Sequence, residues 1–240
     1  MKIITSIVLI VLIVFGFILP GCTRAGSSIN GSGKIIDKDI ELKDFTRVAL
    51  QGPFNLEIVQ SDSFRVTLST DDNLISRILI SPQGETVKFS IEAPANFFPT
   101  SLKVKIAMPR IYGLNLTDGT KATFSEFKST FNFSLSLAES TLTGFLEAGN
   151  SDFRVSKNSQ VNLKGSAIRL DLDGSGMSKI DLGDFTVTSA GVTLKEESEA
   201  TLNVNGRFDV HLEGASKLYY LGNPTISDTS ISGGSFMKQK

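Results

Sequence analysis

Residues 159–182, SQVNLKGSAIRLDLDGSGMSKIDL, contain one full period of the pattern that decides the fold. Ser159 opens this period, and Ser178 opens the next one 19 residues later. A small hydroxyl residue returns at steps of 18 to 20 residues along the chain, at Thr120, Ser140, Ser159, Ser178, Ser198 and Ser216. Self-similarity at a short fixed period is typical of a solenoid, in which each repeat stacks on the one before.

Apolar residues accompany each of these hydroxyl residues at constant distances. One apolar residue follows two positions later: Ala122, Leu142, Val161, Ile180, Ala200 and Leu218. An apolar-x-apolar pair precedes it: Leu114/Leu116, Leu135/Leu137, Phe153/Val155, Leu170/Leu172, Val192/Leu194 and Val210/Leu212. We expect these residues to fill the core, with a further inward column of Phe124, Phe145, Leu163, Leu182 and Leu202.

Within each unit the apolar and polar residues alternate, as in Leu170-Asp171-Leu172 and Lys179-Ile180-Asp181-Leu182. Alternation with period 2 is the pattern of a strand, and turns rich in Gly, Asn and Asp separate the strands. The sequence therefore predicts an all-β protein, a right-handed parallel β-helix (β-solenoid) with coils of about 19 residues. The rival fold is an antiparallel sandwich, whose strands usually recur about every 8–12 residues without register across six units.

Stacking in register would align the outward residues in columns. The expected columns are Asn115, Ser136, Arg154, Asp171, Thr193 and His211; Lys121, Thr141, Gln160, Lys179, Glu199 and Lys217; and Thr123, Thr143, Asn162, Asp181, Thr201 and Tyr219. In this alignment Arg154 neighbours Asp171, and Glu199 lies between Lys179 and Lys217. No two carboxylates fall on adjacent coils of one face, so the paired acids of a glycosidase are not expected.

The N-terminus has the form of a secretory signal. Lys2 is followed by a nearly continuous apolar run from Ile3 to Leu19, and then by Pro20-Gly21-Cys22. A charged start, an apolar segment and a small residue at the cut site define such a signal. The single cysteine at the cut site resembles a bacterial lipoprotein signal, which implies lipidation of Cys22, although Pro20 is uncommon there.

The alternatives are a signal anchor that stays in the membrane and a buried core cysteine. We expect residues 1–21 to be a signal peptide, 22–33 a lipidated Gly/Ser-rich tether, and 34–240 a single solenoid domain. The membrane is then a partner through the lipid on Cys22. Thr23-Arg24 provides no acidic retention signal after the cysteine, which favours the outer membrane.

Strand-like alternation also fills the first part of the domain, at 48–50, 54–60, 66–68, 87–91 and 102–108. Leu74 to Ile80 fits either a helical turn or a strand. Asn96-Phe97-Phe98-Pro99 is an apolar cluster in a loop-like stretch. It is a candidate cap for the open core, and the alternative is an exposed contact patch.

The residues from Phe45 to Gly234 resemble a bacterial family, putative auto-transporter adhesin, head GIN domain. The resemblance rests on Phe45-x-x-Val48-x-Leu50-x-Gly52-Pro53-Phe54-Asn55-Leu56-Glu57-Ile58-x-Gln60, on Leu102-x-Val104-x-Ile106-x-x-Pro109 and on the Gly/Ser-rich coils. It implies a secreted, often lipid-anchored β-solenoid without an established activity. It brings no catalytic residues.

Charge and composition disfavour several classes of function. Lys+Arg number 24 against 25 Asp+Glu, so no basic excess suggests nucleic acid. His211 is the only histidine, which argues against a multi-histidine metal site or a triad. Asp171 to Gly176 lacks the spacing of calcium loops and fits a Gly/Asp turn better. We expect no enzyme, no cofactor and no metal site.

The sequence predicts a non-catalytic, lipid-anchored envelope protein, an adhesion or binding module for a glycan or a protein. One alternative is a glycan-active β-helix enzyme, a lyase or hydrolase. The other is a structural or sensing lipoprotein that acts through a protein partner. The ligand and the oligomeric state are left open at this point.

Overall fold

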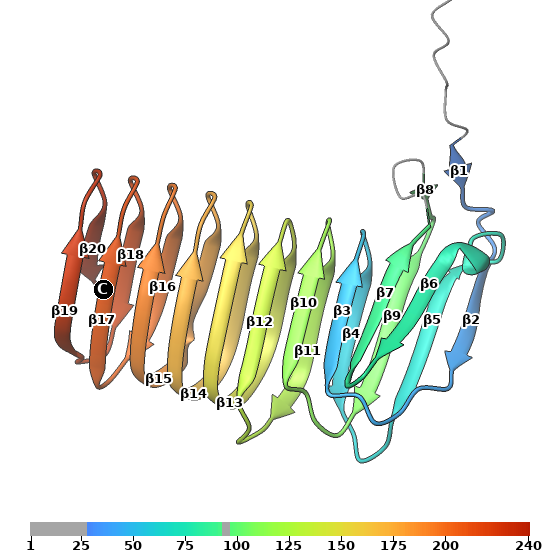
Figure 1. Cartoon of the computed structure of the whole chain (residues 1–240), viewed down its shortest axis with the longest axis horizontal. Coiled ribbons are helices and arrows are strands. Elements are labelled where there is room, and N and C mark those ends of the chain that lie inside the picture. Colours follow the sequence, from blue (N-terminus) through green and yellow to red (C-terminus); the bar gives the residue numbers. More distant parts are fainter. Residues whose placement is uncertain (1–27, 93–96) are drawn as a thin grey trace, which may run out of the picture.

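The computed structural model describes residues 28–92 and 97–240. These residues form a β-solenoid, and Figure 1 shows its strands side by side along a rod, from β2 at one end to β19 at the other. The all-β prediction and the coil length of about 19 residues are confirmed by the parallel register. No helix in the described part of the chain is long and apolar enough to cross a membrane.

The coils build two faces, and each strand pairs with its counterpart in the next coil. The first face, from the N-terminal end, contains β6 (Ile78–Gln83), β7 (Thr86–Ile91), β3 (Arg47–Gln51), β10 (Gly113–Thr117), β12 (Phe133–Ala138), the C-terminal parts of β13 (Thr141–Ser156), β14 (Gln160–Gly174) and β15 (Lys179–Leu194), then β17 (Arg207–Leu212) and β19 (Thr225–Ile231).

The second face contains β2 (Ile35–Ile40), β5 (Arg65–Asp71), β9 (Leu102–Met108), β4 (Asn55–Gln60), β11 (Lys121–Lys128), the N-terminal parts of β13, β14 and β15, then β16 (Glu199–Val204), β18 (Lys217–Leu221) and β20 (Phe236–Gln239). The decisive register is present, since Ile180 pairs in parallel with Val161 on one side and Ala200 on the other. The antiparallel sandwich is thereby excluded.

The repeating hydroxyl residues are buried in the tight turns between the two faces. Their hydroxyls donate to carbonyls of the same turn, for example from Ser159 Oγ to Ser156 O at 2.6 Å and from Ser178 Oγ to Ser175 O at 2.7 Å. Thr120, Ser159, Ser178, Ser198 and Ser216 are each fully buried. The period is therefore set by turns in which a small hydroxyl satisfies backbone groups that strand pairing leaves free.

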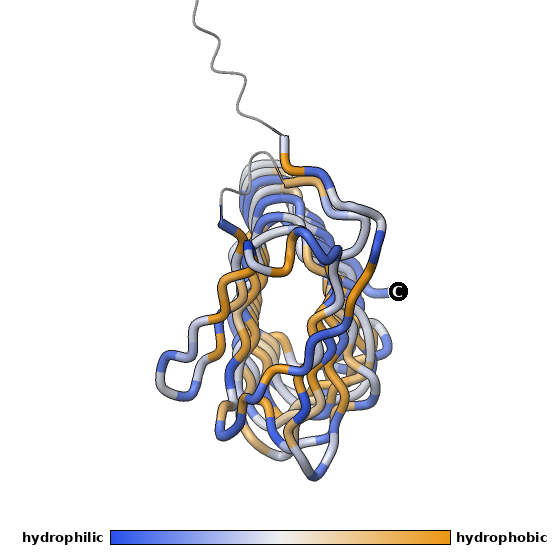
Figure 2. Tube along the Cα trace, turned by 90° about the vertical axis from the view of Figure 1, so that its right-hand side faces the viewer, coloured by the Kyte–Doolittle hydropathy of each residue, from blue (hydrophilic) through white to orange (hydrophobic). Residues whose placement is uncertain are grey.

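The inward side chains of the two faces form one hydrophobic core. Figure 2, a view along the rod, shows hydrophobic and hydrophilic residues alternating along both walls. The expected column from Ala122 to Leu218 is buried throughout. Phenylalanine rings run up the interior, with centroids of Phe133 and Phe153 6.2 Å apart and those of Phe153 and Phe185 also 6.2 Å apart.

One predicted core residue is misplaced. The register puts Gly144, not Phe145, beside Phe124, and Phe145 is half-buried with Lys128 Nζ 5.5 Å from its ring centroid. Gly144 has a φ of +127°, and a Cβ there would lie 2.1 Å from the carbonyl oxygen of Phe124. The strand turns at this glycine, so the next side chain leaves the core.

The N-terminal end departs from the parallel pattern. Beyond β9, strands β5 and β2 run antiparallel, and β6 pairs antiparallel with β7. The undecided stretch Leu74 to Ile80 contains both expected elements, a 3₁₀ turn η1 (Ile75–Arg77) and then the start of β6. Leu74 is fully buried and Ile78 is 8% exposed, so this cap covers the core.

Asp71 holds the start of the described chain onto this cap. Its carboxylate is buried and accepts hydrogen bonds from the N–H groups of Gly33 and Thr100, both at 2.8 Å. Residues 28–33, which the sequence assigns to the tether, thus lie against the solenoid, and β1 (Ile29–Asn30) pairs with β8 (Phe97–Phe98). Of the predicted cluster at 96–99, Asn96 lies outside the described residues, Phe97 is buried and Phe98 is 57% exposed.

Candidate functional site

The second face carries two straight columns of outward polar residues, which we call the polar face. One column is Lys121, Thr141, Gln160, Lys179, Glu199 and Lys217, and the other is Thr123, Thr143, Asn162, Asp181, Thr201 and Tyr219. Both columns have the register that the sequence predicts. Successive residues of a strand point to opposite sides of the sheet. The apolar column that lies between the two polar columns points into the core, so both polar columns point outward.

The middle of the polar face is a shallow depression of about 450 Å³. Its lining includes Thr141, Gln160, Asn162, Lys179, Asp181, Glu199, Thr201 and Lys240. Lys240 Nζ lies 3.2 Å from Thr201 Oγ1 and 4.6 Å from the centroid of the Tyr219 ring. The surface thus offers hydroxyl, amide and charged groups at the regular spacing of the coils, about 4.8 Å.

Toward the N-terminal end the same face holds a charge cluster. Glu57 lies 3.0 Å from Lys105 Nζ and 3.1 Å from Lys103 Nζ. Hydrogen bonds from Lys105, the larger effect, and from Lys103 lower the pKa of Glu57 below its ordinary value. These three side chains are engaged with one another and carry a net charge of +1, which leaves the hydroxyl and amide groups further along the rod as the uncommitted part of the face.

The first face differs from the prediction. Arg154 pairs with Asp173, not with Asp171, and Asp171 pairs with Asp152. Aspartates therefore do lie on adjacent coils of one face, and the same column contains Asp209 beside Asp228. We call Asp152, Asp171, Asp209 and Asp228 the acidic column. The observed register differs from the predicted one by two residues, because Ser151 and Gly174 also occupy inward positions. Each strand thus has three inward positions, and an apolar pair alone does not decide which two of them it fills.

Arginines from the same strands compensate the acidic column. The ion pairs are Arg154 with Asp152 at 2.9 Å, Arg169 with Asp171 at 2.9 Å, and Arg207 with Asp209 at 2.8 Å. The hydrogen bond from Arg207 lowers the pKa of Asp209. His211 lies 3.7 Å from Asp228 on an outward position, as expected for a solvated side chain.

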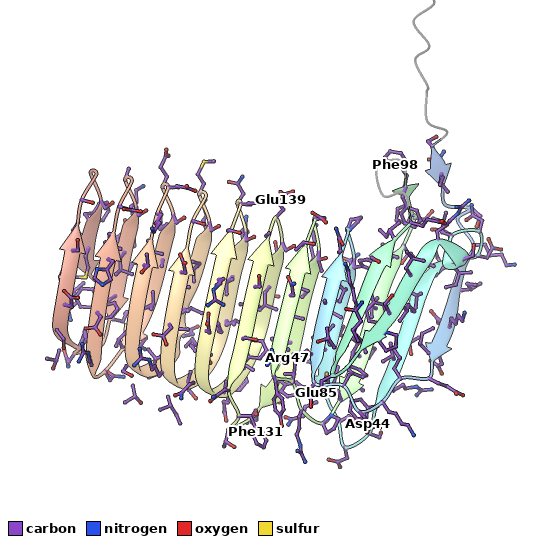
Figure 3. The ribbon with its side chains drawn as sticks, in the orientation of Figure 1. Asp44, Arg47, Glu85, Phe98, Phe131 and Glu139 are labelled. Atoms are coloured by element: carbon purple, nitrogen blue, oxygen red, sulfur yellow. The ribbon has the colours of Figure 1, made fainter. Side chains whose placement is uncertain are left out.

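A small aromatic cluster lies at the edge opposite the serine turns, which Figure 3 shows by the positions of Phe131 and Glu139. Phe131 is 47% exposed, and its ring centroid is 5.3 Å from that of Tyr112 and 5.7 Å from Arg110 Cζ. Sequence reasoning missed this cluster. The available signal was a lone phenylalanine within the polar run 128–132.

Asp171 to Gly176, which the sequence assigns to a Gly/Asp turn rather than to a calcium loop, ends a strand and enters a serine turn, where Ser175 N donates to Val155 O at 2.9 Å. Within residues 28–92 and 97–240, no group of three His, Cys, Asp or Glu side chains is placed to hold a metal ion. Cys22, the predicted lipidation site, lies outside the described residues.

Comparison with known proteins gives a family and a fold. The family model described as "Putative auto-transporter adhesin, head GIN domain" matches residues 44–224. No curated protein matches the chain.

Three solved bacterial structures share the fold. A putative adhesin from Bacteroides fragilis NCTC 9343 has a TM-score of 0.84 at 20% identity, over 89% of this chain and 100% of that one. A putative lipid binding protein from Parabacteroides distasonis ATCC 8503 has a TM-score of 0.69 at 19% identity, over 89% and 100%. A putative adhesin from Parabacteroides merdae ATCC 43184 has 0.65 at 14%, over 89% and 99%. At these identities the likeness concerns the fold.

Proposed function

The chain belongs to the putative auto-transporter adhesin, head GIN domain family, and from this premise we propose that it is a non-catalytic binding module of the cell envelope. Its partner in this proposal is a glycan or a protein outside the cytoplasm. The family and two structural neighbours of this chain are described as putative adhesins, which supports an extracellular or envelope-associated role.

The observation that carries the proposal is the polar face. Hydroxyl and amide side chains such as Thr143, Gln160 and Asn162 stand in columns with the spacing of the coils. A polymer with repeated hydroxyl groups can bond to several coils at once, and several weak contacts then add to useful avidity. We therefore favour a polysaccharide over a compact ligand.

We further propose that the protein is anchored by a lipid on Cys22, at the outer membrane where the cell has one. The support is the sequence Leu19-Pro20-Gly21-Cys22 after an apolar run. Because Ile29 and Asn30 pair with β8, about six residues connect Cys22 to the folded cap. The anchored end of the rod would then stay close to the lipid surface.

Two experiments test these proposals separately. For the ligand, residues 23–240 are applied to an array of bacterial and host polysaccharides, and Asn162→Ala on the polar face is compared with Asn115→Ala on the first face. Both asparagines are exposed and point outward. We expect Asn162→Ala alone to weaken retention, and equal retention by both variants would rule out the polar face.

For the anchor, the natural host expresses the full chain and the Cys22→Ser variant in the presence of a labelled fatty acid. We expect the label on the unmodified chain and none on Cys22→Ser. Label retained by the variant, or absent from both, would rule out lipidation at this residue.

One observation favours a second candidate, a glycan-active enzyme. Asp152 and Asp171 are paired on adjacent coils, at the rung spacing of about 4.8 Å that approaches the carboxylate separation of retaining glycosidases. Against it, each carboxylate is ion-paired with an arginine of its own strand. Release of reducing ends from a retained polysaccharide, lost in Asp171→Asn, would favour the enzyme.

A further inference from the structure

The C-terminal end of the rod leaves core positions uncovered. Ile226 and Ile231 continue the inward columns of Phe208 and Leu212, yet each is 42% exposed, whereas Phe208 is fully buried and Leu212 is 2% exposed. Met237 likewise continues the column of Leu218 and is half-buried. These apolar side chains are exposed because no further coil covers them in the described structure, although terminal repeats of solenoids usually present a polar outer surface.

The same end also presents two free strand edges. In the described structure β19 pairs only with β17, and β20 pairs only with β18. All seven residues of β19 are exposed. A sheet edge with unpaired N–H and C=O groups favours the addition of another strand, and proteins usually protect such edges.

The N-terminal end is better protected, although it also has edge strands, since β2 pairs only with β5 and β6 only with β7 in the described structure. Its inward residues are mostly covered: Leu74 is fully buried, Ile78 is 8% exposed and Ile80 is half-buried. The edge strand β2 carries Asp37, Lys38 and Asp39 in succession, and charged residues on an edge discourage pairing. A head-to-tail chain of rods is therefore disfavoured, and a second C-terminal end is the surface that matches the first in both apolar residues and free edges.

We propose that the C-terminal ends of two copies bind each other and form a closed dimer. A two-fold axis perpendicular to the rod sets the end strands of the two copies antiparallel, which is the more stable pairing. Ile226, Ile231 and Met237 of each copy then become the middle of a continuous core. The contact is isologous, so it stops at two copies.

This inference deepens the proposed function and rests on it, because the role of the dimer in the cell depends on the proposed lipid anchor. The described chain begins at the end of the rod opposite β19 and β20 (Figure 1). A dimer through the C-terminal ends places the two anchored ends at its far extremities. Copies on two facing membranes can therefore meet end to end, and a second copy of this chain is then a protein partner in addition to the polysaccharide on the polar face.

Sedimentation equilibrium of residues 23–240 tests the contact in solution. In two solved relatives the whole chain aligns with 89% of this chain. The solenoid part of those relatives was therefore crystallised without an N-terminal extension. The disrupting variant is Ile226→Lys with Ile231→Lys, and the control is Ile168→Lys, an isoleucine that is 62% exposed at the middle of the rod. Far-UV circular dichroism checks that all variants fold.

We expect a monomer–dimer equilibrium, with a maximum dimension that doubles in small-angle scattering. The double variant should raise the dissociation constant at least tenfold, and Ile168→Lys should leave it unchanged. A chain that stays monomeric at every concentration overturns the inference, whatever covers the C-terminal end instead. A dimer that the double variant leaves intact overturns it as well. Polysaccharide retention by a monomeric chain would still support the proposed function, so the two failures are separable.

Discussion

The backbone N–H of Ser178 donates a hydrogen bond to Ser198 Oγ at 3.3 Å, which ties together two buried serines that are 20 residues apart in sequence. The same contact joins Ser140 to Ser159 at 3.2 Å and Ser216 to Ser235 at 3.0 Å. Ser159 serves its own turn as well, since its hydroxyl also donates to Ser156 O at 2.6 Å. The periodic hydroxyls are structural, and they account for the regularity of the faces on either side.

Replacement of Ser198 by alanine should destabilise the rod. The N–H of Ser178 would lose its partner while buried, and an unsatisfied buried donor costs about 1–3 kcal/mol. Urea unfolding followed by circular dichroism measures the loss. Ser136→Ala, at an exposed outward position, is the control and should change the free energy of unfolding little. Equal effects of the two substitutions would contradict the role of the serine turns.

Alanine at Gly165 should be more damaging. The residue has a φ of +119°, and an added Cβ would lie 2.1 Å from the carbonyl oxygen of Leu146. Backbone strain and the clash together predict a loss of about 3 kcal/mol. Gly84→Ala isolates the strain, because Gly84 has a φ of +58° with nothing within 4 Å of the added Cβ. A smaller loss at Gly165 than at Gly84 would show that the corner adapts.

The column register predicts the effect of charge reversal at Glu199. This residue pairs with Lys179 on one coil and Lys217 on the next. Glu199→Lys would stack three ammonium groups at the coil spacing, and like charges in that position destabilise by a few tenths to about 1 kcal/mol. Glu199→Gln should cost less. The difference in melting temperature should shrink in high salt, and identical melting temperatures would remove the claim that these side chains stack.

Asp71 should make the N-terminal cap sensitive to acid. Burial by itself raises the pKa of this carboxylate, but hydrogen bonds from the backbone of Gly33, Thr100 and Ser101 outweigh burial and the pKa is lowered. A lowered pKa in the folded state stabilises the fold above the ordinary pKa of aspartate, and this contribution is lost as the pH falls through the folded value.

Asp71→Asn should therefore destabilise the protein near neutral pH, because an amide offers one acceptor where the carboxylate offers two. It should also flatten the decline in urea midpoint as the pH falls from about 5 through the ordinary pKa of aspartate and below it. Asp62→Asn, an exposed carboxylate on a loop, is the control. A decline of the same slope in Asp71→Asn would assign the acid sensitivity to other groups.

The two outward columns of the second face were predictable residue by residue, whereas the first face was not. The second-face strands from β11 to β18 begin directly after a serine turn, so counting from Ser159 or Ser178 gives their register without ambiguity. Strands of the first face are reached through corners of variable length, and one such shift lies between Asn162 and Gly165. In β13 and β14 the three inward positions hold two apolar residues and a small one, which explains why Asp171 was placed two residues away.

The N-terminal cap and the aromatic cluster depend on contacts between distant parts of the chain. Alternation at 66–68 and 102–108 indicates strands, but the antiparallel pairing of β5 with β9 has no local signature. Asp71 is likewise one acid among 25 until Gly33 and Thr100 are brought to it by the fold. Gly144 and Phe145 show the same limit, since only the strand path decides which of two neighbours faces inward.

The uniform stacking of coils separates the length of the rod from the chemistry of its ends. Duplication or deletion of one unit between two serine turns would move the ends apart or together by about 4.8 Å and leave both unchanged. The distance between the N-terminal cap and the last coil can thus be altered in discrete steps during evolution or by design. Homologues with more or fewer coils would differ in span while keeping the same two termini.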